Sequence, residues 1–156
     1  MTLWRISNHP ELSGLGGERL RGRWHTAAPG KRVVYLSEHP AVALIENLAN
    51  LSGDPNYLPT HFQLLKVASE DVVVPVAELS TSQLATINER DIAGTQAIGD
   101  AWLAAKSSAL LRIPSIPSPE SWNYLLNPRH PEARTLKIEW ARTMSCDKRL
   151  FHLSHS

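Results

Sequence analysis

The stretch from Gly22 to Leu51 constrains the fold more than any other part of the chain, because it predicts a strand followed directly by a helix. The run Val33–Tyr35 favours extended backbone. Pro40 suits the first turn of a helix, so the chain is expected to change from strand to helix just before it. The apolar positions that share one face of this helix are Ala41, Leu44, Ile45, Leu48 and Leu51. We predict that this face is buried.

Three chemically different side chains are spread over this unit. Arg23 precedes the strand, Tyr35 lies on it and Glu46 lies on the helix. A strand–turn–helix unit can bring such positions together, so we predict that a cation, an aromatic ring and a carboxylate share one pocket. Periodicity alone places Glu46 beside the apolar face, on its flank or in solvent. An ordinary solvated glutamate is therefore the alternative.

The rest of the chain alternates between predicted strands and helices, with no internal repeat or linker. Strands are expected at Leu3–Ile6, His61–Val67, Val72–Val74, Ala109–Ile113, Asn123–Leu126, Arg134–Trp140 and Asp147–Phe151. Helices are expected at Thr81–Asp91 and Thr95–Ser108, the second with a buried face of Ile98, Ala101, Trp102 and Ala105. A length of 156 residues suits one domain, residues 1–156.

The composition excludes several classes of protein. Hydrophobic residues make up 42% of the chain and charged residues 20%, which favours a folded globular protein over a disordered one. A formal net charge of +1 does not favour direct binding of nucleic acid. No uncharged apolar run is long enough to span a bilayer and the N-terminus has no apolar signal core, so we expect a cytoplasmic protein.

The potential metal ligands do not form a predicted metal site. The single cysteine, Cys146, excludes an internal disulfide framework and a cysteine-based zinc site. Five histidines have no ligand-like spacing, namely His9, His25, His39, His61 and His130, while His152 and His155 lie at the chain terminus. We therefore expect no bound metal.

Two further features each have a functional and a purely structural interpretation. A locally basic segment follows Glu18 and contains Arg19, Arg21, Arg23, Lys31 and Arg32. It is either a solvated loop or an anion site, because arginine can grip phosphate oxygens through two parallel hydrogen bonds. Ser115 follows a predicted strand among prolines 114, 117 and 119. It is either a plain loop serine or the donor of a hydrogen bond into a cleft.

Several of these segments, taken in order, resemble one family. They are Gly22–His25, Val34–Ser37, Ala43–Glu46, Ile113–Ser115 and Asn123–Pro131, and Asp147–Leu150 is similar to the usual closing strand of that family. The family is the RES domain, which is named for an arginine, a glutamate and a serine. The resemblance runs from about Leu3 to Phe151 and so covers nearly the whole chain.

This resemblance implies a single α+β domain with a split β-sheet core and flanking helices, similar to the ADP-ribosyltransferase fold. It implies the toxin of a type II toxin–antitoxin pair, whose usual antitoxin is an Xre-like helix-turn-helix protein. Characterised members consume NAD+ by hydrolysis or phosphorolysis, and one branch ADP-ribosylates a protein. NAD+ is then a substrate rather than a bound cofactor, and the acceptor stays open. A non-catalytic, partner-binding module is the alternative from another class.

The resemblance also implies roles for the residues that match its motifs. Cleavage of the nicotinamide–ribose bond builds positive charge on the ribose, which Glu46 would stabilise. Arg23 would hold the diphosphate, Tyr35 would offer a flat face to nicotinamide or its ribose, and Ser115 would supply a positioning hydrogen bond. The expected catalytic residues are Glu46, Arg23 and Tyr35, and the expected NAD+-binding residues are Arg5, Arg23, Tyr35, Ser115 and Asn127.

Overall fold

The computed structural model describes residues 1–51, 59–70 and 73–150. In chain order its elements are β1 (Thr2–Ile6), α1 (Gly16–Arg19), β2 (Val34–Ser37), α2 (Pro40–Asn50), β3 (His61–Ser69), β4 (Val76–Glu78), α3 (Thr81–Thr86), α4 (Ile92–Ala105), β5 (Leu110–Pro114), β6 (Trp122–Leu126), the 3-10 helix η2 (Pro131–Thr135) and β7 (Leu136–Ser145). The predicted change from strand to helix before Pro40 is confirmed, and the His39 side chain caps α2 by accepting from the Ala41 N–H.

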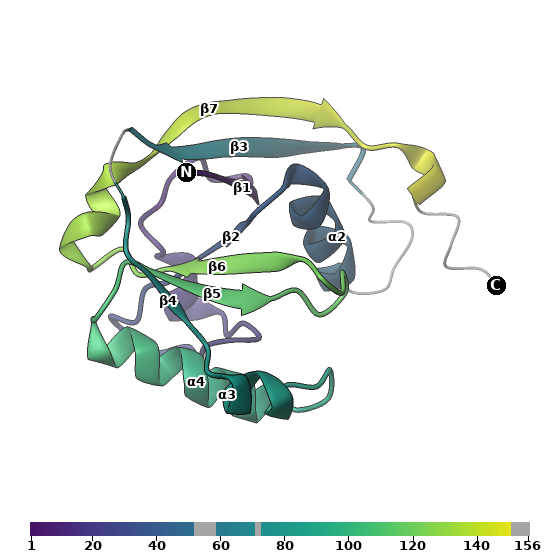
Figure 1. Ribbon diagram of the computed structural model, residues 1–156. Helices are drawn as coiled ribbons and strands as arrows, with labels where there is room; N and C mark the ends of the chain where they lie inside the picture. Colours follow the sequence, from purple (N-terminus) through teal and green to yellow (C-terminus); the bar gives the residue numbers. More distant parts are fainter. Residues whose placement is uncertain (52–58, 71–72, 151–156) are drawn as a thin grey trace.

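The strands form one sheet that is split into two halves. Its order is β4-β5-β6-β2-β1-β3-β7, and every pairing is antiparallel except that of β4 with β5. One residue pair, Trp4 with Ser37, joins β1 to β2, whereas β1 pairs with β3 along its whole length. Figure 1 shows β7 and β3 curving away from β6, β5 and β4. The predicted α+β fold with a split sheet is therefore confirmed.

Two hydrophobic clusters lie on opposite sides of the β5–β6–β2 half, because side chains alternate along a strand. One cluster contains Leu3, Val34, Leu36, Val67, Leu110, Leu126 and Leu136. The other contains Trp24, Val33, Trp102, Leu103, Leu111, Ile113 and Leu125, with Tyr35 packed against it. The second cluster lies between the sheet and α4, which runs below these strands in Figure 1. Tyr35 and its neighbours on the same strand face therefore point to the α4 side.

The buried face of α2 differs from the predicted one. Val42 and Ala43 are buried against the sheet, whereas Ala41 is exposed and Ile45 keeps 39% of its surface in solvent. Apolar residues occupy nearly every position of this helix, so the apolar stripe did not define a unique face. Since Glu46 follows Val42 and Ala43 by four and three residues, it lies on the side that faces the sheet.

The buried face of α4 also differs from the prediction. It consists of Thr95, Gln96, Gly99, Trp102 and Leu103. Of the four predicted residues only Trp102 is buried, while Ile98 is half-buried and Ala101 and Ala105 are exposed. The reason is that α4 packs on polypeptide backbone: the Thr95 hydroxyl donates to the carbonyl of Arg23, and the Gln96 amide donates to the carbonyl of Gly22. A hydrophobic pattern does not detect such a face.

Two of the predicted strands are wrong, and the helix predicted at Thr81–Asp91 ends at Thr86. Val73 and Val74 are not in a strand, and Val72 lies outside the described residues. The edge strand β4 begins only after Pro75, a residue that is tolerated next to an edge strand because it has no N–H to donate to the sheet. At Asp147–Phe151 the chain forms a 3-10 turn over residues 148–150, with Phe151 outside the described residues. There the Asp147 carboxylate accepts from the N–H and guanidinium of Arg149, which favours a local turn. The other predicted strands are confirmed, except that Arg134 and Thr135 belong to η2, so that β7 begins at Leu136.

Candidate functional site

The carboxylate of Glu46 is held by two donors from the sheet. Its Oε1 accepts a hydrogen bond from the Ser115 hydroxyl at 2.7 Å and another from the Asn123 side-chain amide at 2.6 Å. Ser115 follows the end of β5 and Asn123 lies near the start of β6, so one end of the sheet supplies both donors. Glu46 is therefore not a freely solvated glutamate: a helix residue is fixed against two strands.

A further hydrogen bond orients Asn123. The hydroxyl of Ser37, at the end of β2, donates to Asn123 Oδ1 at 2.7 Å, which leaves the amide nitrogen of Asn123 to point at Glu46. Both Ser37 and Asn123 are buried, and the two residues pair directly across β2 and β6. Neither residue is among the site residues predicted from the sequence. The signal that would identify them is strand register, because Ser37 shares a strand face with Tyr35.

Tyr35 lies on that same strand face, and its hydroxyl is fully engaged. The Trp24 N–H donates to the hydroxyl at 3.0 Å, and Nδ1 of His25 lies 2.8 Å from it. Burial raises the pKa of Tyr35 well above its usual range, and the negative charges of Asp100 and Glu46 raise it further. Ser37, on the same strand face, links this strand to the carboxylate, because it orients the Asn123 donor of Glu46. Of the three predicted pocket residues, Tyr35 and Glu46 are thus related through Ser37 and Asn123, and no hydrogen bond joins them directly in the described residues.

Arg23 lies in the segment between α1 and β2, and its guanidinium is bound to the loop before α4. Its Nη1 donates to the carbonyl of Glu89 at 3.0 Å and its Nη2 to the carbonyl of Asn88 at 2.5 Å. Within the described part of the chain, its buried Nε has no hydrogen-bond partner. The backbone beside it is fastened to α4, because Asp100 accepts from both the N–H and the hydroxyl of Thr26. Arg23 therefore lies on a segment that α4 holds in place, and its guanidinium keeps N–H groups that are not hydrogen-bonded within the described residues.

Comparison with known proteins places this arrangement in a family. A model of the RES domain matches residues 2–149. The chain belongs to the RES domain family. Glu46 and Ser115, which lie in two of the segments that resemble the family, are hydrogen-bonded here across 69 positions of sequence.

Curated relatives and a solved structure agree with this assignment. The chain is 40% identical over 151 residues to "Toxin Res" of Pseudomonas putida, covering 97% of this chain and 100% of the relative. It is 30% identical over 158 residues to "Prs ADP-ribosylating toxin" of a Sphingobium species, with 96% of each covered. A chain from the crystal structure of the M. tuberculosis MbcT–MbcA toxin–antitoxin complex superposes with a TM-score of 0.69 at 17% identity, covering 97% of this chain and 87% of that one. This last likeness shows the fold.

The two remaining predicted NAD+-binding residues lie elsewhere in this RES domain. Arg5 donates to the carbonyl of Glu11 at 2.9 Å, and burial lowers the pKa of its guanidinium although Glu11 partly offsets this. Asn127 is buried and its Oδ1 accepts from the Arg129 N–H. It follows Asn123 by four residues and lies just beyond the end of β6, a distance of about 13 Å in extended chain. Glu46, Ser115, Asn123 and Ser37 together form the Glu46 cluster. Neither Arg5 nor Asn127 has a hydrogen bond to this cluster within the described part of the chain.

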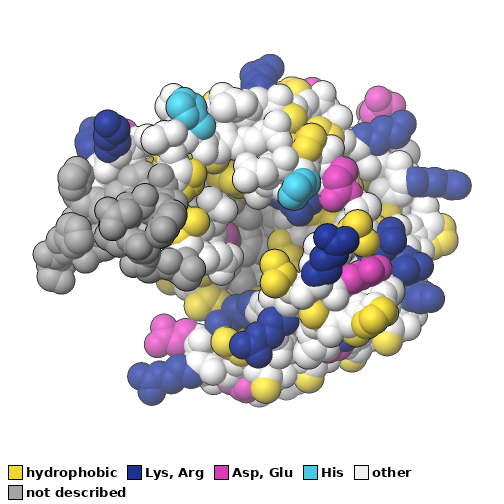
Figure 2. All heavy atoms as spheres, turned by 180° about the vertical axis from the view of Figure 1, so that it is seen from behind, with side chains coloured by type: hydrophobic (Ala, Val, Ile, Leu, Met, Phe, Trp, Pro, Cys, Tyr) yellow, Lys and Arg dark blue, Asp and Glu magenta, His cyan; other side chains and the backbone are white. Residues whose placement is uncertain are grey.

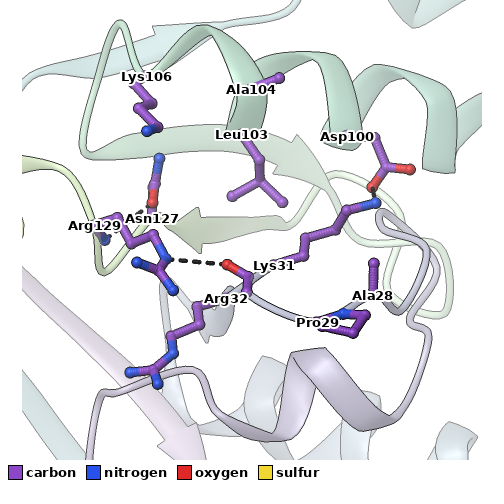
Figure 3. Close-up of a pocket in the computed structure, with 11 residues that line it drawn as sticks. Ala28, Pro29, Lys31, Arg32, Asp100, Leu103, Ala104, Lys106, Asn127 and Arg129 are labelled. Carbon is purple, nitrogen blue, oxygen red and sulfur yellow. Dashed lines mark hydrogen bonds and ion pairs between the residues drawn. The ribbon is translucent and has the colours of Figure 1, made fainter.

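Asn127 instead lines a separate cavity of about 450 Å³ at the far end of α4 (Figure 3). The cavity is also lined by Ala28, Pro29, Gly30, Lys31, Arg32, Asp100, Leu103, Ala104, Lys106 and Arg129. Much of its positive charge is already paired. Lys31 lies 3.1 Å from Asp100, and Arg32, which points away in Figure 3, lies 3.0 Å from Glu18. The predicted basic segment is thus partly an ion-paired loop, away from Glu46.

The molecule is also hollowed on the face turned away from the viewer in Figure 1. Figure 2 shows this hollow, with Lys and Arg side chains gathered along its rim.

Over residues 1–51, 59–70 and 73–150 there is no group of three or more His, Cys, Asp or Glu side chains that could hold a metal ion. Over the same residues, no helix is both long and apolar enough to cross a membrane.

Proposed function

We propose that this RES domain is the toxin of a toxin–antitoxin pair and that it cleaves the nicotinamide–ribose bond of NAD+. The observation that carries the proposal is the fixed carboxylate of Glu46. Both of its donors, Ser115 and Asn123, converge on Oε1. Oε2 is then available to a substrate, because nothing in the described residues donates to it.

A carboxylate held in this way suits the chemistry of the bond. As the nicotinamide leaves, positive charge develops on the ribose, and a pre-oriented negative charge stabilises it without having to reorganise. Glu46 is this charge in our proposal. Ser115 and Asn123 set its direction, and Ser37 sets that of Asn123.

The other expected residues take supporting roles. Arginine has five N–H donors, and the loop carbonyls occupy Nη1 and Nη2 of Arg23 with one bond each. The second hydrogens of the two Nη atoms are then free to hold a diphosphate, whereas Nε is buried away from solvent. Tyr35 presents its ring to the nicotinamide or ribose. Arg5 and Asn127 keep their proposed part in NAD+ binding only if the ligand extends beyond the Glu46 cluster.

Release of free nicotinamide from NAD+ by the purified protein tests this proposal. Wild-type protein should release nicotinamide, and Glu46→Gln should lower the rate by about a hundredfold or more, the usual effect of losing one charge-stabilising group. Because a glutamine oxygen still accepts from Ser115 and Asn123, the fold should survive. Glu139→Gln is the matched control, since it removes the same charge from an exposed glutamate on β7 that pairs with Lys66 of β3. Near-normal turnover in Glu46→Gln would exclude Glu46 from the reaction.

A protein ADP-ribosyltransferase is the second candidate, because the Sphingobium relative bears that activity in its name. Both activities break the same bond and differ in the acceptor. Labelled NAD+ separates them: hydrolysis yields free ADP-ribose, phosphorolysis yields a phosphorylated ADP-ribose only when phosphate is present, and transfer leaves the label on protein. No release of nicotinamide under any of these conditions would favour a non-catalytic binding module.

We further propose that an Xre-like antitoxin binds this toxin and blocks the pocket. The solved structural neighbour comes from a toxin–antitoxin complex, and Arg19 and Arg21 are exposed beside the Arg23 segment. An acidic segment of the antitoxin would pair with them, so its association should slow with added salt and with excess NAD+. Arg21→Glu should weaken the complex, whereas Lys137→Glu, an exposed change on β7, should not. If neither excess NAD+ nor Arg21→Glu changes the association of the antitoxin, the antitoxin binds a surface remote from the pocket.

A further inference from the structure

The protonation state of His25 follows from its neighbours. Its Nε2 lies 3.1 Å from the carbonyl oxygen of Gly17 and 3.0 Å from that of Leu20. A carbonyl oxygen only accepts hydrogen bonds, so Nε2 must carry a proton. Burial lowers the pKa of His25, which favours the neutral ring, so Nδ1 is left as an acceptor.

This tautomer fixes the direction of the Tyr35 hydroxyl. Its oxygen lies 2.8 Å from Nδ1 of His25 and 3.0 Å from the Trp24 nitrogen. The Trp24 N–H can only donate, so the Tyr35 oxygen accepts it and the Tyr35 O–H donates to His25. The hydroxyl proton is thereby committed to His25.

Close packing of backbone against this pair leaves it little freedom. A Cβ atom on Gly22 would overlap the Tyr35 hydroxyl oxygen, and it would lie 2.9 Å from Nδ1 of His25. Gly22 itself is tied to α4, since its carbonyl accepts from the Gln96 amide at 2.9 Å. The pair is thus enclosed by a segment that α4 holds in place.

From this geometry we propose that His25 is a positioning residue for NAD+ cleavage: it clamps the Tyr35 hydroxyl so that Tyr35 meets the substrate with its ring. The proposal rests on the proposed function of the Glu46 site. It assigns the ring of Tyr35, rather than its hydroxyl, as the contacting group, because the hydroxyl donates its only proton to His25 and already accepts from the Trp24 N–H.

Two substitutions at His25 separate the clamp from the general support of the loop. Asn places an amide oxygen near Nδ1 and keeps an acceptor for Tyr35. Gln places an amide nitrogen near Nε2 and keeps a donor for the Gly17 and Leu20 carbonyls. We expect His25→Gln to lower kcat by roughly tenfold, the effect of one lost hydrogen bond, with KM changed by less than about twofold. His25→Asn should retain more of kcat although it loses more thermal stability.

A double-variant cycle makes the test specific. Tyr35→Phe keeps the ring but has no hydroxyl to clamp, so His25→Gln should cause no further loss of kcat in that background. Losses that multiply in the double variant, or a wild-type kcat in His25→Gln, would overturn the clamp. Thermal unfolding of each variant confirms that the comparison is made between folded proteins.

Nitrogen-15 NMR of the histidine rings gives a readout that needs no enzymatic activity. We expect His25 to carry its proton on Nε2 and the Nδ1 signal to move in Tyr35→Phe. If Nδ1 carries the proton, the inference is wrong even if NAD+ is cleaved. If the wild-type protein cleaves no NAD+ yet shows this tautomer, the clamp stands as a structural contact while its catalytic role and the proposed function both fail.

Discussion

Replacing Asn123 with aspartate would place a second carboxylate against Glu46. In the native site the Asn123 amide donates to Glu46 Oε1 at 2.6 Å, and the Ser37 hydroxyl donates to its Oδ1. Aspartate has nearly the same shape and still accepts from Ser37, but it offers Glu46 a negative charge in place of a donor. The substitution therefore changes electrostatics with little change in packing.

The size of the effect follows from the separation of the charges. Two unit charges about 4 Å apart repel by about 4 kcal/mol at an effective dielectric constant of about 20. That energy is a factor of about a thousand in the proton affinity of the pair, since each tenfold step is about 1.4 kcal/mol. Glu46 and Asp at position 123 would thus share a proton up to a pH about three units higher than either carboxylate alone.

Nicotinamide release measured as a function of pH tests this reasoning. In Asn123→Asp the acid limb of the rate profile should move up by about three pH units, so that activity near neutral pH falls sharply and recovers in part in alkali. The folded pair binds protons more tightly than the unfolded chain, so the variant should lose stability as the pH rises towards neutrality.

A charge added at the far end of α2, the helix that carries Glu46, provides the control for this variant. Asn50→Asp introduces the same charge at the exposed last residue of α2 and should leave the profile in place. An acid limb that stays unmoved in Asn123→Asp, in folded protein, would refute the placement of Asn123 against the reacting carboxylate.

Three other perturbations follow from the same structure. Arg23→Lys should weaken NAD+ binding in calorimetry by about tenfold, because lysine lacks the guanidinium fork; unchanged affinity would move the diphosphate site elsewhere. Gly22→Ala should lower activity by displacing Tyr35, whereas Gly16→Ala, where the added Cβ meets nothing within 4 Å, should be neutral. Because burial lowers the pKa of His25, denaturant titrations should show wild-type stability falling as the pH drops below about 6.5, and His25→Gln should reduce this dependence.

Local sequence signals were sufficient for the strand–helix unit and for most strands. The β-branched run before Ser37 and the proline at position 40 encode β2 and the start of α2 within a few residues of each other. They could not give the orientation of α2, since Val42 and Ala43 are as apolar as the residues predicted to be buried. Nor could they give the polar face of α4, where Thr95 and Gln96 are buried by hydrogen bonds to backbone. Both errors concern which part of the protein a helix packs against, and this is decided by tertiary structure rather than by the helix's own sequence.

The composition of the Glu46 cluster follows from the place where the two halves of the sheet meet. Ser37 pairs through its backbone with Trp4 of β1 and through its hydroxyl with Asn123 of β6, so one residue both joins the halves and orients a donor to Glu46. Glu46 stands on α2, which contacts β1 and β2, the two strands at that junction. Its donors come from 69 and 77 residues further along the chain. No local pattern relates positions so far apart, and only the antiparallel register of β2 with β6 and of β6 with β5 brings them to one carboxylate.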